Sequence, residues 1–172
     1  MSRTAVVAAA QMGPIEKDEP RQSTVARMIS MMRQAKERGA NLIVFPELAL
    51  TTFFPRYWME NEVDVDAFFE RDMPGPATQP LFDEAAKLGV GFYLGYAELA
   101  EEKGRTRHFN TSIIVDREGK ITGKYRNVHL PGHHEYEPWR PFQHLEKPYF
   151  PVLYTPLTLP TISPVNTLEL PA

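Results

Sequence analysis

The chain has 172 residues, a formal net charge of −3 and a sequence pI near 6.0, which suits a single domain with its own core. Its nineteen Lys and Arg residues are dispersed and no apolar run approaches the length of a membrane span, so we expect no nucleic-acid or membrane partner and a cytoplasmic location. Cysteine is absent, which excludes disulfides, thiolate metal sites and a thiol nucleophile within these residues.

The first part of the chain alternates between strand and helix patterns. Residues 4–12 form an apolar run that ends at a Gly-Pro pair and predicts a buried strand. Ser23 or Thr24 can cap a helix whose apolar side chains recur every three or four residues, and Gly39 can end that helix. Residues 42–45 then predict a second buried strand, short and continuous as in a parallel sheet.

The next part of the pattern adds one helix and three strands. Residues 78–87 predict a helix that ends before Gly89 and leads into a strand over residues 90–98. Residues 109–115 and 121–126 predict two further strands, joined by a turn that contains a glycine. The order strand, helix, strand, helix, strand, strand, strand indicates an α/β fold with a mixed sheet.

Residues 148–172 have a different character, with six prolines and a single charged residue, Glu169. Proline prevents helix formation and interrupts central strands, so we expect this segment to be irregular or extended. It is either a proline-rich arm that packs on the domain or on a partner, or a tail that was never selected to complete this fold. The sequence therefore predicts a partial domain over residues 1–147, followed by a proline-rich tail.

Glu47 stands directly behind the second predicted strand, in the segment Leu-Ile-Val-Phe-Pro-Glu over residues 42–47. Ligands bind at the carboxyl ends of strands in layered α/β sheets, and a carboxylate in such a place can act as a general base. The structural alternative is that Glu47 pairs with an arginine or caps the following turn.

Several blocks of sequence, taken together, favour the chemical role. They are Phe-Pro-Glu-Leu-Ala at 45–49, Thr-Thr-Phe-Phe-Pro-Arg at 51–56, Met-Pro-Gly-Pro at 73–76, Leu-Gly-Tyr-Ala-Glu-Leu at 94–99, Phe-Asn-Thr-Ser at 109–112, and the segments 123–133 and 136–147. In this order they resemble the nitrilase-like carbon-nitrogen hydrolases and, within them, the N-carbamoyl-D-amino acid amidohydrolases. The resemblance runs from the first strand through Lys147, and we expect the chain to be truncated or frame-altered after that residue.

The resemblance implies a four-layer α-β-β-α sandwich, of which this chain would supply the N-terminal part, with no metal and no organic cofactor. It also implies a small-molecule N-carbamoyl or amide substrate and association into homo-oligomers. In such a site a Cys thiolate attacks the carbamoyl or amide carbon, a Glu relays the proton and a Lys stabilises the oxyanion. A carbamoylase would release the free D-amino acid, carbon dioxide and ammonia.

When the family's catalytic residues are matched to this sequence position by position, the chain has the general base but lacks the lysine. Glu47 matches the family's base. The family's lysine position is Asn127 here, and an amide carries no charge with which to stabilise an oxyanion. Lys124 is a poor replacement, because the positions 124 and 127 differ by an odd number and their side chains would point to opposite faces of a strand.

Three further positions match the family's site. Glu146 corresponds to a residue that helps to orient the catalytic groups, although an isolated acid beside Lys147 could equally form a surface ion pair. His129 and His144 match positions near the substrate, and their alternative is a role as hydrogen-bonded structural histidines.

The family's nucleophile lies beyond the block that ends at Lys147, and no cysteine occurs in this chain. Ser163 is a conceivable substitute, but it has no assigned base and serine is a poor nucleophile without one. We therefore expect an N-carbamoyl-D-amino acid amidohydrolase homologue that does not turn over. The alternative is a non-catalytic ligand-binding or assembly partner of an intact family member, and a weaker third reading is an enzyme with an unusual nucleophile.

Two other motifs receive structural interpretations. His129, His133 and His134 lie close together in sequence, but the Pro-Gly pair between them breaks any helix that would align metal ligands, so we expect no metal. The Asn-Thr-Ser segment at 110–112 formally matches a glycosylation acceptor. Without a secretory signal we interpret it as ordinary strand residues.

Overall fold

The computed structural model describes residues 4–57, 59 and 61–127. The predictions that lie outside the described residues are those for His129, His133, His134, His144, Glu146, Ser163 and residues 148–172. None of the described helices combines the length and the apolar character that crossing a bilayer requires.

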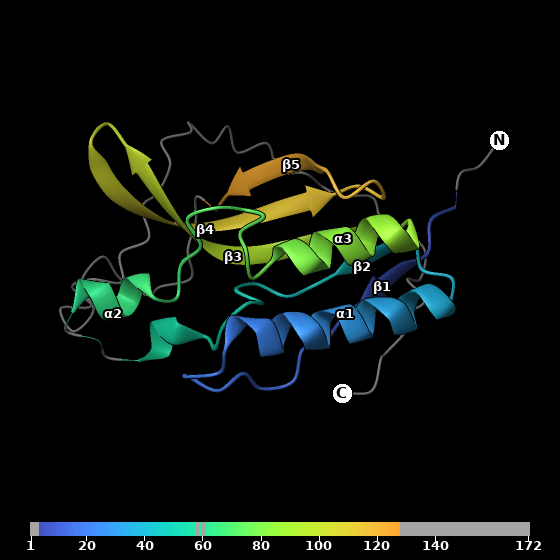
Figure 1. Ribbon diagram of the computed structural model, residues 1–172, viewed down its shortest axis with the longest axis horizontal. Helices are drawn as coiled ribbons and strands as arrows, with labels where there is room; N and C mark the ends of the chain where they lie inside the picture. The colour runs from blue at the N-terminus through green and yellow to red at the C-terminus, as the bar shows by residue number, and fades with distance from the viewer. Residues whose placement is uncertain (1–3, 58, 60, 128–172) are drawn as a thin grey trace, which may run out of the picture.

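One five-stranded mixed sheet forms the centre of the fold, as the sequence predicts (Figure 1). Its strands are β1 (Val7–Ala9), β2 (Leu42–Val44), β3 (Gly91–Glu102), β4 (Arg105–Val115) and β5 (Ile121–Arg126), side by side in that order. The first three strands are parallel, whereas β4 and β5 each run antiparallel to the strand before. The carboxyl ends of β1 and β2 therefore lie side by side at one edge of the sheet, where Glu47 follows β2.

Two helices, α1 (Arg21–Glu37) and α3 (Gln79–Leu88), lie side by side on one face of this sheet (Figure 1). Alternate strand residues point toward them and form the main core. Its largest fully buried side chains are Met28, Met32, Ile43, Phe45, Leu81, Val90, Phe92, Leu94 and Ile113. A smaller cluster near η1 (Phe54–Arg56) and α2 (Glu62–Asp66) contains Leu48, Phe54, Met59, Val65, Phe68, Phe69, Ala97 and Leu99.

Helix α1 begins before the predicted cap at Ser23 or Thr24, so that prediction was wrong. Pro20 precedes the helix with φ −61° and ψ 140°, and the fixed φ of proline suits a helix start. Thr24 is instead buried in the first turn, where its hydroxyl donates to Glu19 Oε1 at 3.3 Å. Gly39 lies just past the helix end with φ 86°, as predicted.

Strands β3 and β4 are longer than predicted and form a hairpin that extends beyond the rest of the sheet (Figure 1). The predicted strands stop short of the hairpin tip because its sequence is rich in charge. In the structure the charges pair across the strands, for example Arg107 Nη1 with Glu102 Oε2 at 3.0 Å. Lys103 and Gly104 make the turn with φ 54° and 74°, the signs that a tight two-residue hairpin turn requires.

The face of the sheet opposite α1 and α3 carries exposed apolar side chains. Val7 is 39% exposed, Ile114 is 42% exposed and Tyr125 is 57% exposed. Strand alternation and the observed register place all three on this face. The described residues thus build one sheet and one helical layer of the four-layer sandwich that the resemblance implies.

Candidate active site

Glu47 lies on a loop that leaves the end of β2 and passes over β3. The chain is hydrogen bonded to β3 on both sides of it, because the backbone N–H groups of Phe45 and Ala49 donate to β3 carbonyls at 3.0 and 2.9 Å. Between them Leu48 has φ 50°, a left-handed conformation that costs a non-glycine residue roughly 1–2 kcal/mol. Leu48 is buried in the smaller apolar cluster, which offsets that cost. The loop that carries Glu47 is therefore fixed rather than loosely attached.

This loop approaches β3 so closely that only glycine fits beneath it. A Cβ on Gly95 would lie 2.9 Å from Glu47 Cα and 3.1 Å from the carbonyl oxygen of Pro46. Both atoms belong to the backbone, so a side chain at this position would have to displace the loop. Gly95 therefore sets the height of Glu47 above the sheet.

Asn110 on β4 holds the carboxylate of Glu47. Its side-chain Nδ2 donates a hydrogen bond to Glu47 Oε1. Asn110 is only 3% exposed, and its Oδ1 is buried without a hydrogen-bond partner among the described residues. The general base predicted from the sequence is thus positioned by a neutral amide, which fixes its direction without neutralising its charge.

Asn127 lies directly across from Asn110 on the β5 side. Its backbone N–H donates to the Asn110 carbonyl oxygen at 2.8 Å and continues the β4–β5 ladder, in which Thr111 pairs with Arg126. Because successive residues of a strand point to opposite faces, position 127 shares the face of Asn110 and Glu47. Lys124 lies on the other face, where its Nζ is 2.5 Å from Glu98 Oε1, so the prediction that Lys124 and position 127 point to opposite faces is confirmed.

Glu98 is a buried carboxylate on the face opposite Glu47, which is itself exposed. It accepts hydrogen bonds from Thr111 Oγ1 at 2.7 Å, Lys124 Nζ at 2.5 Å and Arg126 Nε at 2.9 Å. Burial acts to raise the pKa of Glu98, but the hydrogen bonds from Arg126, Lys124 and Thr111 outweigh it and hold this pKa at about 2. Glu98 therefore stays ionised at neutral pH and serves as a structural anion that binds three strands together.

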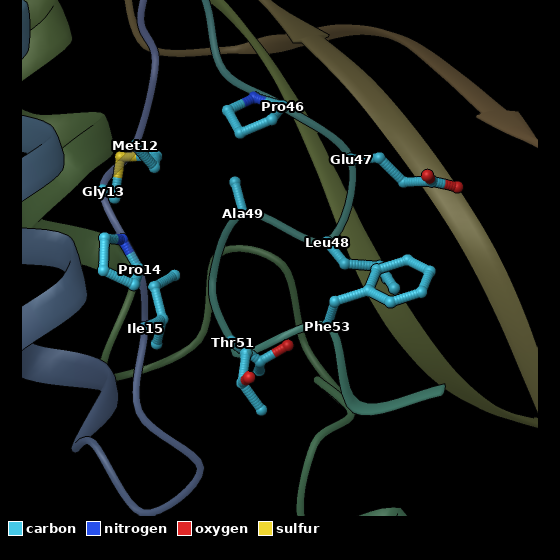
Figure 2. Close-up of a pocket in the computed structure, with 11 residues that line it drawn as sticks. Met12, Gly13, Pro14, Ile15, Pro46, Glu47, Leu48, Ala49, Thr51 and Phe53 are labelled. Atoms are coloured by element: carbon cyan, nitrogen blue, oxygen red, sulfur yellow. The ribbon is translucent and has the colours of Figure 1, made fainter. Parts of the chain in front are cut away.

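A pocket of about 250 Å³ lies beside the Glu47 loop, between residues 12–15 and residues 46–53. Figure 2 shows that the Glu47 side chain points away from Met12 and Pro14, which line the other side of this pocket. The carboxylate instead faces the strands, where Asn110 binds it. The pocket and the carboxylate therefore lie on different sides of the loop.

His108, which sequence reasoning did not single out, lies with two carboxylates at the start of the β4 hairpin. Its Nε2 is 2.5 Å from Asp66 Oδ1, and Glu62 completes a group whose ligand atoms lie within 4.8 Å of one another. The buried imidazole also packs edge-on against Phe69, with ring centroids 4.7 Å apart. These contacts tie α2 to β4, and within the described residues these three side chains have the chemistry to hold a cation.

Comparison with known proteins establishes the family. The model of the carbon-nitrogen hydrolase family matches residues 6–166 of the chain. The chain belongs to the carbon-nitrogen hydrolase family.

This member of the family is 30% identical over 126 residues to Nitrilase 2 from an unknown prokaryotic organism, a match that covers 69% of this chain and 39% of that protein. It is also 30% identical over 112 residues to the N-carbamoylputrescine amidase of Arabidopsis thaliana, covering 63% of this chain and 34% of that protein. A solved carbon-nitrogen hydrolase from Helicobacter pylori G27 matches with a TM-score of 0.58 at 22% identity, covering 74% of this chain and 40% of that chain. The chain thus spans about a third to two fifths of the length of the curated relatives, and the carbon-nitrogen hydrolase fold is confirmed.

Two of the site residues implied by the resemblance, Glu47 and Asn127, lie within the described part of the carbon-nitrogen hydrolase fold, on one face of the sheet. The roles of Glu146, His129 and His144 stay predictions. The family match extends past Lys147, and the domain boundary predicted there also stays a prediction.

Sequence reasoning missed Asn110. Its Asn-Thr-Ser segment was interpreted as strand residues within a block of the resemblance, and no spacing rule links it to a glutamate 63 positions earlier. The signal lies in the register, which becomes visible only when β3, β4 and β5 are placed side by side.

Proposed function

We propose that this chain is a homologue of the N-carbamoyl-D-amino acid amidohydrolases that keeps the general base but does not hydrolyse the substrate by itself. The proposal includes a small-molecule N-carbamoyl or amide substrate and a cytoplasmic location. The observation that carries it is the shared face of Glu47, Asn110 and position 127. On that face the base is held in place, whereas the residue that should bring positive charge is an asparagine.

The chemistry explains why such a site stops short of turnover. Hydrolysis of a carbamoyl C–N bond needs a nucleophile for the carbonyl carbon, a base for the nucleophile's proton and positive charge for the oxyanion. Glu47 supplies the base. The 172 residues contain no cysteine, and Lys124 is bound to Glu98 on the other face. Loss of one oxyanion donor alone typically lowers kcat by about 10²–10³-fold, and loss of the nucleophile lowers it further.

Ammonia release from N-carbamoyl-D-amino acids tests the proposal. We expect the purified chain to release no more ammonia than its Glu47→Gln variant, while an intact N-carbamoyl-D-amino acid amidohydrolase releases it under the same conditions. Mass spectrometry of the chain after incubation should show no covalent carbamoyl adduct. Release of ammonia that depends on Glu47, or an adduct on any side chain, would refute the proposed inactivity.

The exposed sheet face favours a second role, as an assembly partner. Val7, Ile114 and Tyr125 expose apolar surface that a further layer of the fold, a second copy or an intact family member could cover. Size-exclusion chromatography with light scattering distinguishes these cases. A stable complex with an intact family member would support the partner role, and a homo-oligomer of this chain alone would support self-association.

A further inference from the structure

The amide of Asn110 has two ends, and only one of them is occupied. Nδ2 donates to Glu47, whereas Oδ1 is buried and has no hydrogen-bond partner among the described residues. An ionised carboxylate only accepts hydrogen bonds, so the donor end of the amide must face Glu47. This fixes the orientation of the group and leaves an acceptor directed elsewhere.

The sheet register shows what lies on that other side. Glu47 sits over β3, with its Cα above Gly95, whereas residue 127 lies across from Asn110 on the β5 side. Asn110 on β4 therefore stands between the general base and position 127. Nδ2 and Oδ1 are the two branches of one planar amide, so an Nδ2 that donates to Glu47 leaves Oδ1 for another donor, and position 127 is the cross-strand neighbour on the β5 side.

Burial indicates where the missing donor should come from. Asn110 Oδ1 has essentially no contact with solvent, so neither bulk water nor a diffusing substrate reaches it in this structure. A buried acceptor without a partner is unfavourable, and most such groups in proteins are satisfied by a neighbouring donor. The short side chain of Asn127 does not donate to it. A lysine carries its ammonium on a four-carbon stem with three donors, and cross-strand neighbours on one face lie within reach of long side chains.

We propose that Asn110 is a positioning residue with two functions: its Nδ2 holds the Glu47 carboxylate, and its Oδ1 is the acceptor for an N–H donor carried at position 127. A lysine ammonium at 127 would then be held beside Glu47 by the same amide. The proposal rests on the proposed function in taking position 127 as the place of the catalytic cation, but it requires no turnover by this chain.

A double-mutant cycle tests the proposal. Asn127→Lys and Asn127→Met introduce long unbranched side chains that differ in the terminal donor, and each is made with Asn110 present and with Asn110→Ala. With Asn110 present we expect the unfolding equilibrium constant in urea to be about tenfold smaller for the Lys variant than for the Met variant, as a hydrogen bond from a charged donor predicts. With Asn110→Ala this ratio should fall several-fold. A ratio that Asn110→Ala leaves unchanged would overturn the proposal.

A second measurement avoids the risk that Asn110→Ala fails to fold. The side-chain carbonyl carbon of Asn110 can be followed by NMR in the two position-127 variants that keep Asn110. We expect its resonance to move downfield in the Lys variant relative to the Met variant. The side-chain carbonyl of Asn41, which already accepts a hydrogen bond from the Val6 N–H at 2.9 Å, serves as the control that should not move. An Asn110 signal that is the same in both variants would contradict the proposed acceptor role.

These readouts do not depend on catalysis. Ammonia release by the unmodified chain would refute the proposed inactivity, but the double-mutant cycle would still test the role of Asn110. Absence of coupling between positions 110 and 127 would refute the role of Asn110 and leave the family assignment in place.

Discussion

Glu47 is exposed whereas Glu98 is buried, and different hydrogen-bond donors hold their two carboxylates. Glu98 is held by a hydroxyl and two cationic side chains on the helical face of the sheet. Glu47 is held by one neutral amide on the opposite face. A carboxylate paired with cations is a poor proton acceptor, whereas one oriented by an amide keeps its charge available. At the scale of single residues, the number and charge of the donors therefore distinguish the structural carboxylate of Glu98 from Glu47, the general base that we propose.

The low pKa of Glu98 predicts a specific acid sensitivity. Its folded-state pKa of about 2 lies below the ordinary value of 4.5, so its contribution to stability is complete above about pH 4.5 and is lost as the pH falls toward 2. The contribution should be on the order of 3 kcal/mol, and Glu98→Gln should remove it. Urea unfolding at several pH values between 2 and 6 measures this difference.

The matched control for this experiment is Glu101→Gln, because Glu101 lies on the same strand with a side chain that is 60% exposed. We expect Glu101→Gln to change stability by less than about 1 kcal/mol at any of these pH values. If Glu98→Gln and the unmodified chain show the same loss of stability between pH 4.5 and 2, Glu98 is not the group responsible.

The residues that carry chemistry could be predicted from the sequence only where a block of sequence surrounds them. Glu47 stands in the Phe-Pro-Glu-Leu-Ala block, and Asn127 stands in a block that fixes its correspondence to a lysine. Glu98 and Asn110 also stand in such blocks, at 94–99 and 109–112, but no role was predicted for either because their contacts depend on which strands lie next to each other. A polar residue in a strand pattern does not show whether it faces a base, a cation or solvent.

At the scale of elements, the close contact between the Glu47 loop and β3 predicts the effect of Gly95→Ala. The added Cβ would meet the backbone of residues 46 and 47 at 2.9–3.1 Å, and relief requires the loop to move. We expect a loss of stability of about 2–3 kcal/mol, at the upper end for overpacking, because backbone yields less easily than a side chain. The Asn110 side-chain amide resonances should shift as well, since Glu47 moves with the loop.

Gly104→Ala is the appropriate comparison. Gly104 has φ 74° in the hairpin turn, but an added Cβ would have no neighbour within 4 Å. The expected cost is therefore only that of the left-handed backbone, about 1 kcal/mol, with no change in the Asn110 resonances. If Gly95→Ala proved no more harmful than Gly104→Ala, the close approach would not be what positions the loop.

The order and type of the main elements could be predicted, because apolar periodicity and glycines mark them clearly. The residues at which the elements begin and end were predicted less well. The hairpin of β3 and β4 continues through charged residues because Arg107 and Glu102 pair across it, a long-range contact that local sequence does not reveal. Helix α1 begins at Arg21, earlier than predicted, because Pro20 fixes the backbone there. The hydroxyl of Thr24 donates a hydrogen bond to Glu19 instead of capping the helix.

At the scale of the whole molecule, the uncovered sheet face predicts self-association of the isolated chain. Ile114 and Tyr125 are exposed next to each other on the β4–β5 ladder. We expect the sedimentation coefficient to rise with protein concentration, and the double substitution of Ile114→Thr and Tyr125→Thr to reduce this rise. Threonine keeps the preference for strand while removing apolar surface.

Val63→Thr provides the control for that experiment. Val63 is 79% exposed, but it lies on α2 rather than on the sheet face. The same loss of an exposed apolar side chain should leave the concentration dependence unchanged. A chain that remains monomeric at all concentrations, or a Val63→Thr effect as large as that of the double substitution, would contradict association through the sheet.

The pairing of Asn127 with Asn110 has a consequence for how this chain can change over generations. The backbone hydrogen bonds between β4 and β5, rather than the side chain at position 127, determine the face of the sheet to which that side chain points. Codons for asparagine and lysine differ only in their third base, so one nucleotide substitution could place an ammonium at position 127 without any rebuilding of the backbone. A single inserted or deleted residue within β5 would instead turn the position to the wrong side. A positive charge at position 127 could therefore be gained by substitution far more readily than a misplaced strand could be corrected.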